Sequence, residues 1–159
     1  MNRQQLKLIP RSTATNAYDL MADVVKVIRD EPKRMDMSTF TRLKMKFVPK
    51  ARRPACGTIG CVAGWMVMLT MSDEHLWEIR DAGLMSEWRA QQLLPSSVRG
   101  AASRLFYSMV HAGDDGTPAY AEEVITLIEA FMRDHEAALR AHVLTEEDND
   151  NLVPAGQVT

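Results

Sequence analysis

Both cysteines of the chain lie in one short stretch, Cys56 to Trp65, which reads Cys-Gly-Thr-Ile-Gly-Cys-Val-Ala-Gly-Trp. Cysteine thiolates act as nucleophiles and as ligands for soft metals, and glycines allow sharp backbone turns. The stretch also opens the longest apolar run of the sequence, Ile59 to Met71. Residue types suited to chemistry occur here at close spacing, and they permit three chemical interpretations.

The first interpretation makes Cys61 a catalytic nucleophile. Thr58 is a good N-cap for a helix beginning near Ile59. Cys61 would then lie in the first turn, where N–H groups without helical partners and the helix dipole lower a thiol pKa. A helix-opening cysteine followed closely by a tryptophan resembles papain-like hydrolases. Such an enzyme needs a histidine base, and the candidates are His75, His111, His135 and His142. None of them lies in a distinctive motif, so we favour Cys61 as a small buried apolar residue.

The second interpretation makes Cys56 and Cys61 metal ligands. Zinc sites commonly pair cysteines two to four residues apart and add a second pair of ligands elsewhere. Four residues separate these two cysteines, at the edge of that range, and no second pair at ligand spacing occurs. His135 and His142 are expected two turns apart on one helix, too far to hold one ion together. We therefore expect no metal and no other cofactor.

The third interpretation makes Gly57, Thr58 and Gly60 an anion-binding turn at a helix N-terminus, with Arg52 and Arg53 just upstream. The stretch lacks the lysine and the glycine spacing of a P-loop. The same glycines equally allow the following helix to turn sharply and pack closely. We favour this structural role over an anion site.

Charge is split along the chain. Residues 1–53 contain 13 basic and 5 acidic residues, a local charge of +8, whereas residues 54–159 contain 6 basic and 16 acidic residues, a local charge of −10. The candidate binding residues of the basic part are Arg34, Arg42, Lys44, Lys46, Lys50, Arg52 and Arg53. A basic face of this kind can bind a nucleic acid, or it can attract an acidic surface of this chain or of a second copy.

Helices have to position these residues. Asn16 is a good N-cap for a helix that ends before Pro32, and Thr117 followed by Pro118 starts the longest helix, whose apolar stripe runs to Leu139. Further helices are expected at about 73–82, 86–94 and 97–110. The run from Cys61 to Met71 is apolar on all sides, which predicts the buried central helix of the fold.

These elements predict an all-α fold, because no strand pair and no alternation of strands with helices stands out. The length indicates one domain, which we place at residues 15–144. Residues 1–14 are expected to form a flexible arm, and the acidic residues 145–159 a disordered tail. The longest apolar run is too short to span a membrane, and the N-terminal residues Met1 to Pro10 contain no apolar core of a signal peptide. We therefore expect a cytoplasmic protein without a membrane partner.

The order of features resembles a group of small helical proteins from bacteria and their phages, for which no activity is established. The matching pieces are Glu31-Pro32, Asp36-Met37, the segment from Cys56 to Trp65, Leu105-Phe106 and Thr117-Pro118. The resemblance covers about residues 16–135, and the cysteine segment is its specific motif. Met66 stands where that group has a small residue. The resemblance implies a compact helical fold and a phage or prophage setting, and it implies no particular reaction.

The sequence as a whole favours a non-enzymatic protein that binds another macromolecule. We expect a phage or prophage factor that acts on a host or defence protein in the host cytoplasm. One alternative is a nucleic-acid-binding protein that uses the basic segment 33–53. Another is a thiol- or metal-dependent enzyme centred on Cys56 and Cys61. The eleven methionines suit an adaptable contact surface or a core, and a homodimer fits the apolar segments.

Overall fold

A computed structural model describes residues 9–37, 41–42, 59–71, 87–108, 110, 113–114 and 116–145. The α-helices in these residues are α1 (Ala17–Asp30), α2 (Val62–Thr70), α4 (Glu87–Gln92), α5 (Arg99–Phe106), α6 (Pro118–Asp134) and α7 (Glu136–Ala141). Two 3₁₀ helices, η1 (Pro32–Arg34) and η2 (Ser96–Val98), and the two-residue strands β1 (Thr41–Arg42) and β2 (Ile59–Gly60) complete the described elements. The all-α class expected from the sequence is confirmed.

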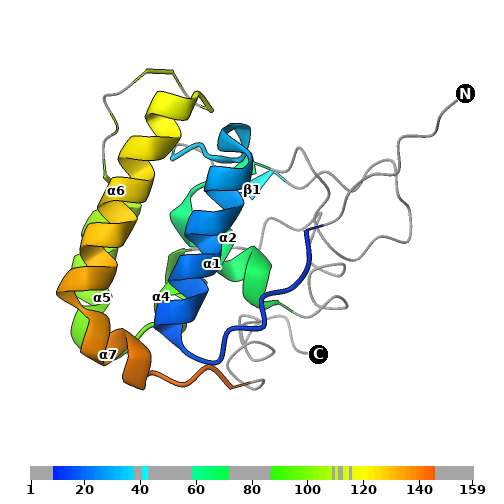
Figure 1. The fold of residues 1–159 in the computed structure, drawn as a ribbon. Helices are drawn as coiled ribbons and strands as arrows, with labels where there is room; N and C mark the ends of the chain where they lie inside the picture. The colour runs from blue at the N-terminus through cyan, green and yellow to red at the C-terminus, as the bar shows by residue number, and fades with distance from the viewer. Residues whose placement is uncertain are drawn as a thin grey trace, which may run out of the picture.

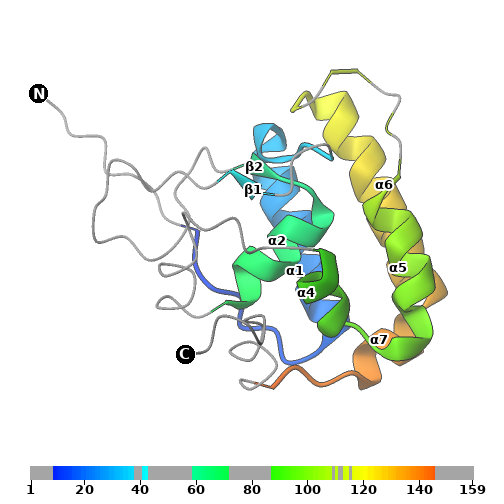
Figure 2. The same cartoon turned by 180° about the vertical axis from the view of Figure 1, so that it is seen from behind.

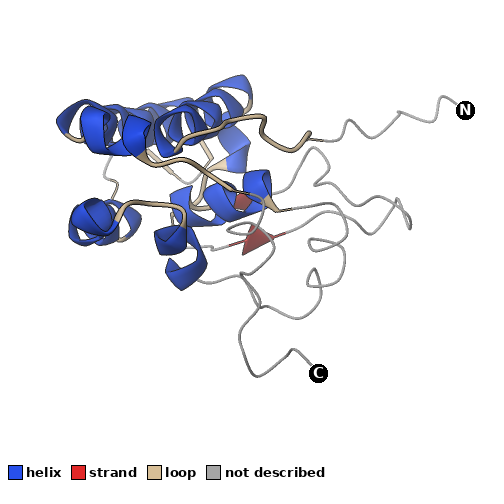
Figure 3. Cartoon of the chain, turned by 90° about the horizontal axis from the view of Figure 1, so that it is seen from below, coloured by secondary structure: helices blue, strands red, loops and turns tan. Residues whose placement is uncertain are grey.

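The helices form two layers. Helices α1, α6 and α7 lie on one side of the molecule, and α2, α4 and α5 lie on the other (Figures 1 and 2). The view from below separates the layers and places the β1–β2 pair beside α2 (Figure 3). Helix α1 packs against α2, α6 and α7, and α2 also packs against α4. The hydrophobic core therefore lies between α1 and α2 and extends under α6.

Helix α1 follows its sequence signals closely. The Asn16 side chain accepts a hydrogen bond from the Asp19 N–H (2.9 Å), which satisfies one N–H of the first turn. The helix ends at Asp30, before Pro32, as expected. Apolar residues at helical spacing face the core; the fully buried ones include Leu20, Met21, Val24 and Ile28. One face of α1 is thus committed to packing, and the opposite face is left to solvent.

Helix α2 is the buried centre of the fold. Every residue from Val62 to Thr70 is buried, and Trp65 is fully covered. The Thr70 hydroxyl donates to the Met66 and Val67 carbonyls (2.9 and 3.1 Å), so the hydroxyl is satisfied within the helix. This confirms the central helix predicted from the apolar run.

The start of α2 differs from the prediction. We expected Thr58 to cap a helix beginning near Ile59, but Ile59 and Gly60 are extended and pair antiparallel with Thr41 and Arg42. The helix begins at Val62, and Cys61 is its N-cap. The strand pair, which the sequence pattern did not suggest, draws the residues before Cys61 into an extended conformation and delays the helix.

The last predicted helix is divided in two. Helix α6 begins at Pro118 after the Thr117 cap, as expected, but it ends at Asp134, and α7 starts at Glu136. His135 (φ −124°, ψ 21°) interrupts the helix while the apolar stripe continues to Leu139, which is fully buried. The predicted helix at 97–110 is also shorter, because η2 precedes it and α5 ends at Phe106. None of the described helices is long and apolar enough to cross a membrane.

Segments near the two ends of the described chain pack on the helices. Ser12 N–H donates to the Leu69 carbonyl (2.8 Å) and Arg11 Nε to the Thr70 carbonyl (2.8 Å), so residues 9–14 lie against the C-terminal end of α2. This part of the expected flexible arm is packed, and Ile9 is buried. At the other end, the Ala17 N–H donates to the His142 carbonyl (3.0 Å) and the Leu144 N–H to the Thr15 carbonyl (2.9 Å). These hydrogen bonds join the segment after α7 to the start of α1. Residues 1–8, 146–159 and the helix expected at 73–82 lie outside the described residues.

Candidate functional site

The Cys61 thiol caps the central helix. Its Sγ accepts a hydrogen bond from the Gly64 N–H at 3.5 Å, in the geometry that a serine or asparagine oxygen usually provides. Cys61 is 6% exposed and belongs to the hydrophobic core. A thiol in this position stabilises the start of the helix and packs against apolar neighbours, as the favoured interpretation of the sequence expected.

Burial controls the acidity of this thiol. The helix N-terminus was expected to lower its pKa, and hydrogen bonds from backbone N–H groups do act in that direction. Burial outweighs them and raises the pKa of Cys61 above its ordinary value of 9.0. The folded protein therefore carries less thiolate than an exposed cysteine at neutral pH, which disfavours the nucleophile interpretation.

We expect native Cys61 to react with iodoacetamide at pH 7.5 at least roughly tenfold more slowly than in unfolded protein, because its thiolate is scarce and covered. Peptide mass spectrometry after timed alkylation measures the rate. The raised pKa means that the folded state holds the Cys61 proton more tightly than the unfolded state does, which stabilises the fold. This contribution to stability is complete below pH 9.0 and declines as pH rises through the folded pKa. Equal alkylation rates in native and unfolded protein would contradict the interpretation of Cys61 as a buried, weakly acidic thiol.

The described histidines do not lie beside Cys61. His135 separates α6 from α7 and stacks near Phe131, with ring centroids 5.0 Å apart. His142 is the C-cap of α7, and Figure 2 shows α7 at the opposite end of the molecule from β2, which directly precedes Cys61. His75, His111 and Cys56 lie outside the described residues. Within the described ranges, no group of three His, Cys, Asp or Glu side chains could hold a metal ion.

Gly60 has a structural role at the proposed anion turn. It pairs with Thr41 across the two strands, and its carbonyl accepts the Asp36 N–H at 3.2 Å. Gly60 thereby links β1, the segment after η1 and the start of α2. Gly57 and Thr58 lie outside the described residues, so the anion interpretation of this turn stays a prediction.

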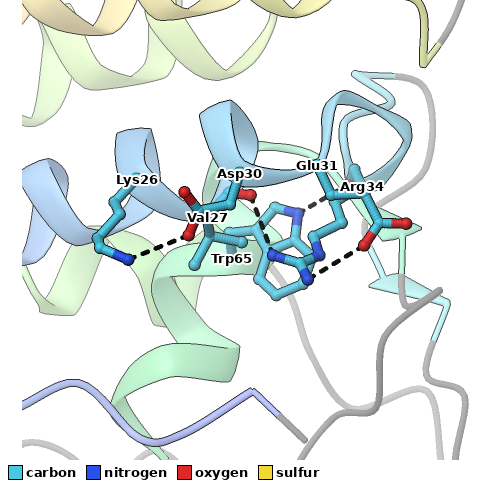
Figure 4. Close-up of polar contacts among 6 residues, drawn as sticks. All are labelled: Lys26, Val27, Asp30, Glu31, Arg34 and Trp65. Atoms are coloured by element: carbon cyan, nitrogen blue, oxygen red, sulfur yellow. Dashed lines mark hydrogen bonds and ion pairs between the residues drawn. The ribbon is translucent and has the colours of Figure 1, made fainter. Parts of the chain in front are cut away.

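Arg34, one of the expected basic binding residues, is mostly buried and has partners within the chain. Its side chain is 9% exposed, and its guanidinium pairs with Glu31 (3.1 Å) and donates to the Val27 carbonyl (3.2 Å). Its own carbonyl accepts the Trp65 Nε1–H at 2.9 Å, so it connects η1 to the central helix (Figure 4). Arg34 therefore has a structural role, with most of its side chain covered.

Of the other basic candidates, the structure describes Arg42. Arg42 lies in β1, whose pairing with β2 anchors this part of the chain next to the start of α2. The other candidate binding residues, Lys44, Lys46, Lys50, Arg52 and Arg53, lie outside the described residues. Their role in binding therefore stays a prediction.

Replacing Arg34 with Met should lower the free energy of unfolding by about 2 kcal/mol. Removing one partner of a buried ion pair is worth about 3–5 kcal/mol, and the partial exposure of Glu31 (35%) reduces that figure. Urea unfolding followed by circular dichroism measures the change. The matched control is Arg29→Met, because the Arg29–Glu129 pair is about half exposed on both sides and should contribute about 0.5 kcal/mol or less. Equal losses in the two variants would show that Arg34 is not structural.

A groove of about 540 Å³ lies between α1 and α6. Its apolar lining consists of Tyr18, Ala22, Val25 and Met132, and its charged lining of Lys26, Arg29, Asp30, Glu129, Arg133 and Glu136. The ion pair between Arg29 and Glu129 (3.0 Å) spans the two helices. We call this hollow the α1–α6 groove. It combines an apolar floor with a rim of three basic and three acidic side chains.

A second hollow, of about 850 Å³, lies on the other side of α1, and we call it the N-terminal groove. Residues 9–13 form one wall and α1 the other, with Leu69 and Arg34 also lining it. Ser12 donates to the Asp23 carboxylate across this groove. Lys26 and Asp30 pair at 3.0 Å (Figure 4). Both residues line both grooves, so this pair lies between them.

Reasoning from the sequence missed both grooves, because each is formed by segments far apart in the chain. Ala22 offers a weak signal: it is a small residue on the exposed face of α1, where a groove needs room. These features define an all-helical domain with a buried central helix and two grooves along one surface helix. Comparison with known proteins found no matching family model, no matching curated protein and no matching solved structure.

Proposed function

We propose that this chain is a non-enzymatic protein that binds another protein through the α1–α6 groove. The groove carries the proposal, because it places partly covered apolar side chains inside a rim with equal numbers of acidic and basic groups. Protein interfaces commonly combine an apolar centre with a polar rim. The buried, weakly acidic Cys61 thiol gives no comparable support to an enzyme.

The setting we propose is that of a phage or prophage factor acting on a host or defence protein. This part rests on the resemblance carried by the segment from Cys56 to Trp65 and by the helices around it. The basic residues from Arg42 to Arg53 would then either extend the protein interface or contact a nucleic acid. A second copy of the chain is another candidate partner, and native mass spectrometry of the purified protein tests for it.

A photo-crosslinking residue at position 22 tests the groove directly. Ala22 is exposed and lines the α1–α6 groove, and Arg104, which is exposed on α5, provides the control position. In cells that naturally carry this chain, we expect one defined crosslinked protein from position 22 and not from position 104. Crosslinking of the same proteins from both positions would contradict a specific groove interface.

Purified components then measure the affinity. Ala22→Arg should weaken binding of the crosslinked partner at least roughly tenfold by titration calorimetry, because an added charge occupies the groove floor. Cys61→Ser should leave the affinity unchanged, which separates a binding function from thiol chemistry. The variant carrying Lys44→Glu, Lys46→Glu, Arg52→Glu and Arg53→Glu shows whether the basic segment contributes. Loss of binding in this variant with full binding by Ala22→Arg would move the interface from the groove to the basic segment.

A further inference from the structure

The described residues include two buried arginines, and they differ in one respect. Arg34 is paired with Glu31 and hydrogen-bonded to Val27, as shown above. Arg89, on α4, is 0% exposed, and its Nε, Nη1 and Nη2 atoms have no hydrogen-bond partner among the described residues. All three donor nitrogens of the Arg89 guanidinium are therefore covered and unsatisfied, whereas Nη1 and Nη2 of Arg34 have a carbonyl and a carboxylate.

A covered guanidinium without a partner is an unstable arrangement. Burial lowers the pKa of Arg89, yet a guanidinium keeps its proton in proteins, so the positive charge remains. Charged groups inside proteins are normally paired or bound to a counter-ion, because loss of their hydration is strongly unfavourable. Arg89 thus has five N–H donors and a full charge for which the described part of the chain supplies no acceptor.

We infer that Arg89 is a binding position for an oxyanion, a phosphate or carboxylate group held by the guanidinium. The planar guanidinium offers parallel N–H donors that match two oxygens of such a group, which makes this class of ligand the best fit. The inference is independent of the protein-binding function proposed for the α1–α6 groove, because Arg89 does not line that groove.

The lack of an acceptor is particular to Arg89 and is not shared by Arg99, the next arginine along the chain, at the start of α5. Helix α4 packs against both α2 and α5. The nearby Arg99 has acceptors within the chain, since its Nε donates to the Gln91 and Leu94 carbonyls (3.0 and 3.3 Å). Helix α4 also reaches the surface, where Trp88 is 54% exposed. Because Arg89 is 0% exposed, an anion can contact it only after the atoms around it move apart, so we expect association to be slow.

Thermal unfolding of the full chain in phosphate tests the inference. The probes are inorganic phosphate, sulfate and acetate, each compared with sodium chloride at equal ionic strength. We expect the Tm of the unsubstituted protein to rise by roughly 3–5 °C for each tenfold increase in phosphate above its Kd. The rise should persist in Arg34→Met, the matched buried arginine, and disappear in Arg89→Met. A response to acetate without a response to phosphate or sulfate would identify a carboxylate as the ligand.

The same variants give a second readout in chloride alone. Arg89→Met should unfold at a temperature equal to or above that of the unsubstituted protein, because it removes an unpaired charge, whereas Arg34→Met should unfold at a lower one. A loss in Arg89→Met as large as that in Arg34→Met would overturn the inference, since it would reveal a partner within the chain. Equal phosphate responses in Arg89→Met and the unsubstituted protein, or no response to any probe, would also overturn it.

A spectroscopic measurement keeps the inference testable if Arg89→Met does not fold. In the isotope-labelled, unsubstituted protein, phosphate should shift the Arg89 Nε–Hε resonance in a saturable way and leave that of Arg99 in place. Slow exchange between two Arg89 signals would match the expected slow association. An unchanged Arg89 resonance at saturating phosphate, sulfate and acetate would overturn the inference.

Discussion

Replacing Trp65 with Ala should lower the free energy of unfolding by about 4 kcal/mol or more. The indole is fully buried at the centre of α2, and truncating a buried tryptophan to alanine is worth about 3–5 kcal/mol. The change also removes the Nε1–H bond to the Arg34 carbonyl (2.9 Å), which connects α2 to η1. Because domains of this kind are stable by about 5–15 kcal/mol in total, this loss removes a large fraction of the stability and should lower the Tm markedly.

Two further variants separate the contributions of Trp65. Trp65→Phe keeps most of the apolar volume but cannot donate a hydrogen bond, and it should be destabilised by about 1–2 kcal/mol. Trp88→Ala removes a tryptophan that is 54% exposed and should change stability by about 0.5 kcal/mol or less. Urea unfolding followed by far-ultraviolet circular dichroism compares all three, independently of indole fluorescence. A loss for Trp65→Ala no larger than that for Trp88→Ala would show that α2 is not the core.

The elements predicted correctly from the sequence are those whose signals are local. Asn16 caps α1 and Thr117 caps α6 because each side chain reaches an N–H three residues later in the same segment. The apolar run of α2 identifies a buried helix without knowledge of its neighbours. Caps and apolar runs depend on a few consecutive residues, so they survive any arrangement of the other helices.

The parts that sequence reasoning missed depend on distant segments. The start of α2 is set by pairing of Ile59 and Gly60 with Thr41 and Arg42, some eighteen residues earlier in the chain. Thr58 is a good N-cap by residue type, but Ile59 and Gly60, which would have formed the first turn of the helix, pair with β1 instead. The interruption at His135 carries no proline or glycine signal in the sequence.

The candidate sites show the same limit for charged residues. We placed Arg34 among the expected basic binding residues because its neighbours in the chain are basic. Its environment in the fold is set instead by Glu31, Val27 and the packing of α2. Arg89 has no unusual neighbours in the sequence, so nothing there marks it as a candidate site residue. For an arginine, the distinction between a surface contact, a structural ion pair and a ligand position depends on burial and on acceptors, which only the fold supplies.

Removing α7 should lower the free energy of unfolding by about 4 kcal/mol. A chain that stops after His135 loses Leu139, a fully buried residue whose removal alone is worth about 3 kcal/mol. It also loses the Arg140 guanidinium stacked 3.8 Å from the Tyr18 ring, worth about 0.5–1 kcal/mol. The backbone bonds that join Ala17 to His142 and Thr15 to Leu144 disappear as well. Urea unfolding of the purified truncated chain measures the total.

The matched control stops after Thr145 and removes only residues 146–159, which the sequence predicts to be a disordered acidic tail. This chain keeps α7 and both backbone bonds, so we expect its stability to stay within about 0.5 kcal/mol of the full chain. Equal losses in the two truncations would assign the stabilisation to the tail instead of α7. Because Glu136 on α7 also lines the α1–α6 groove, the shorter chain should bind a groove partner more weakly, whereas the control should bind it normally. Stability and binding should then both decrease only when α7 is removed, because this helix packs against α1 and contributes Glu136 to the lining of the groove.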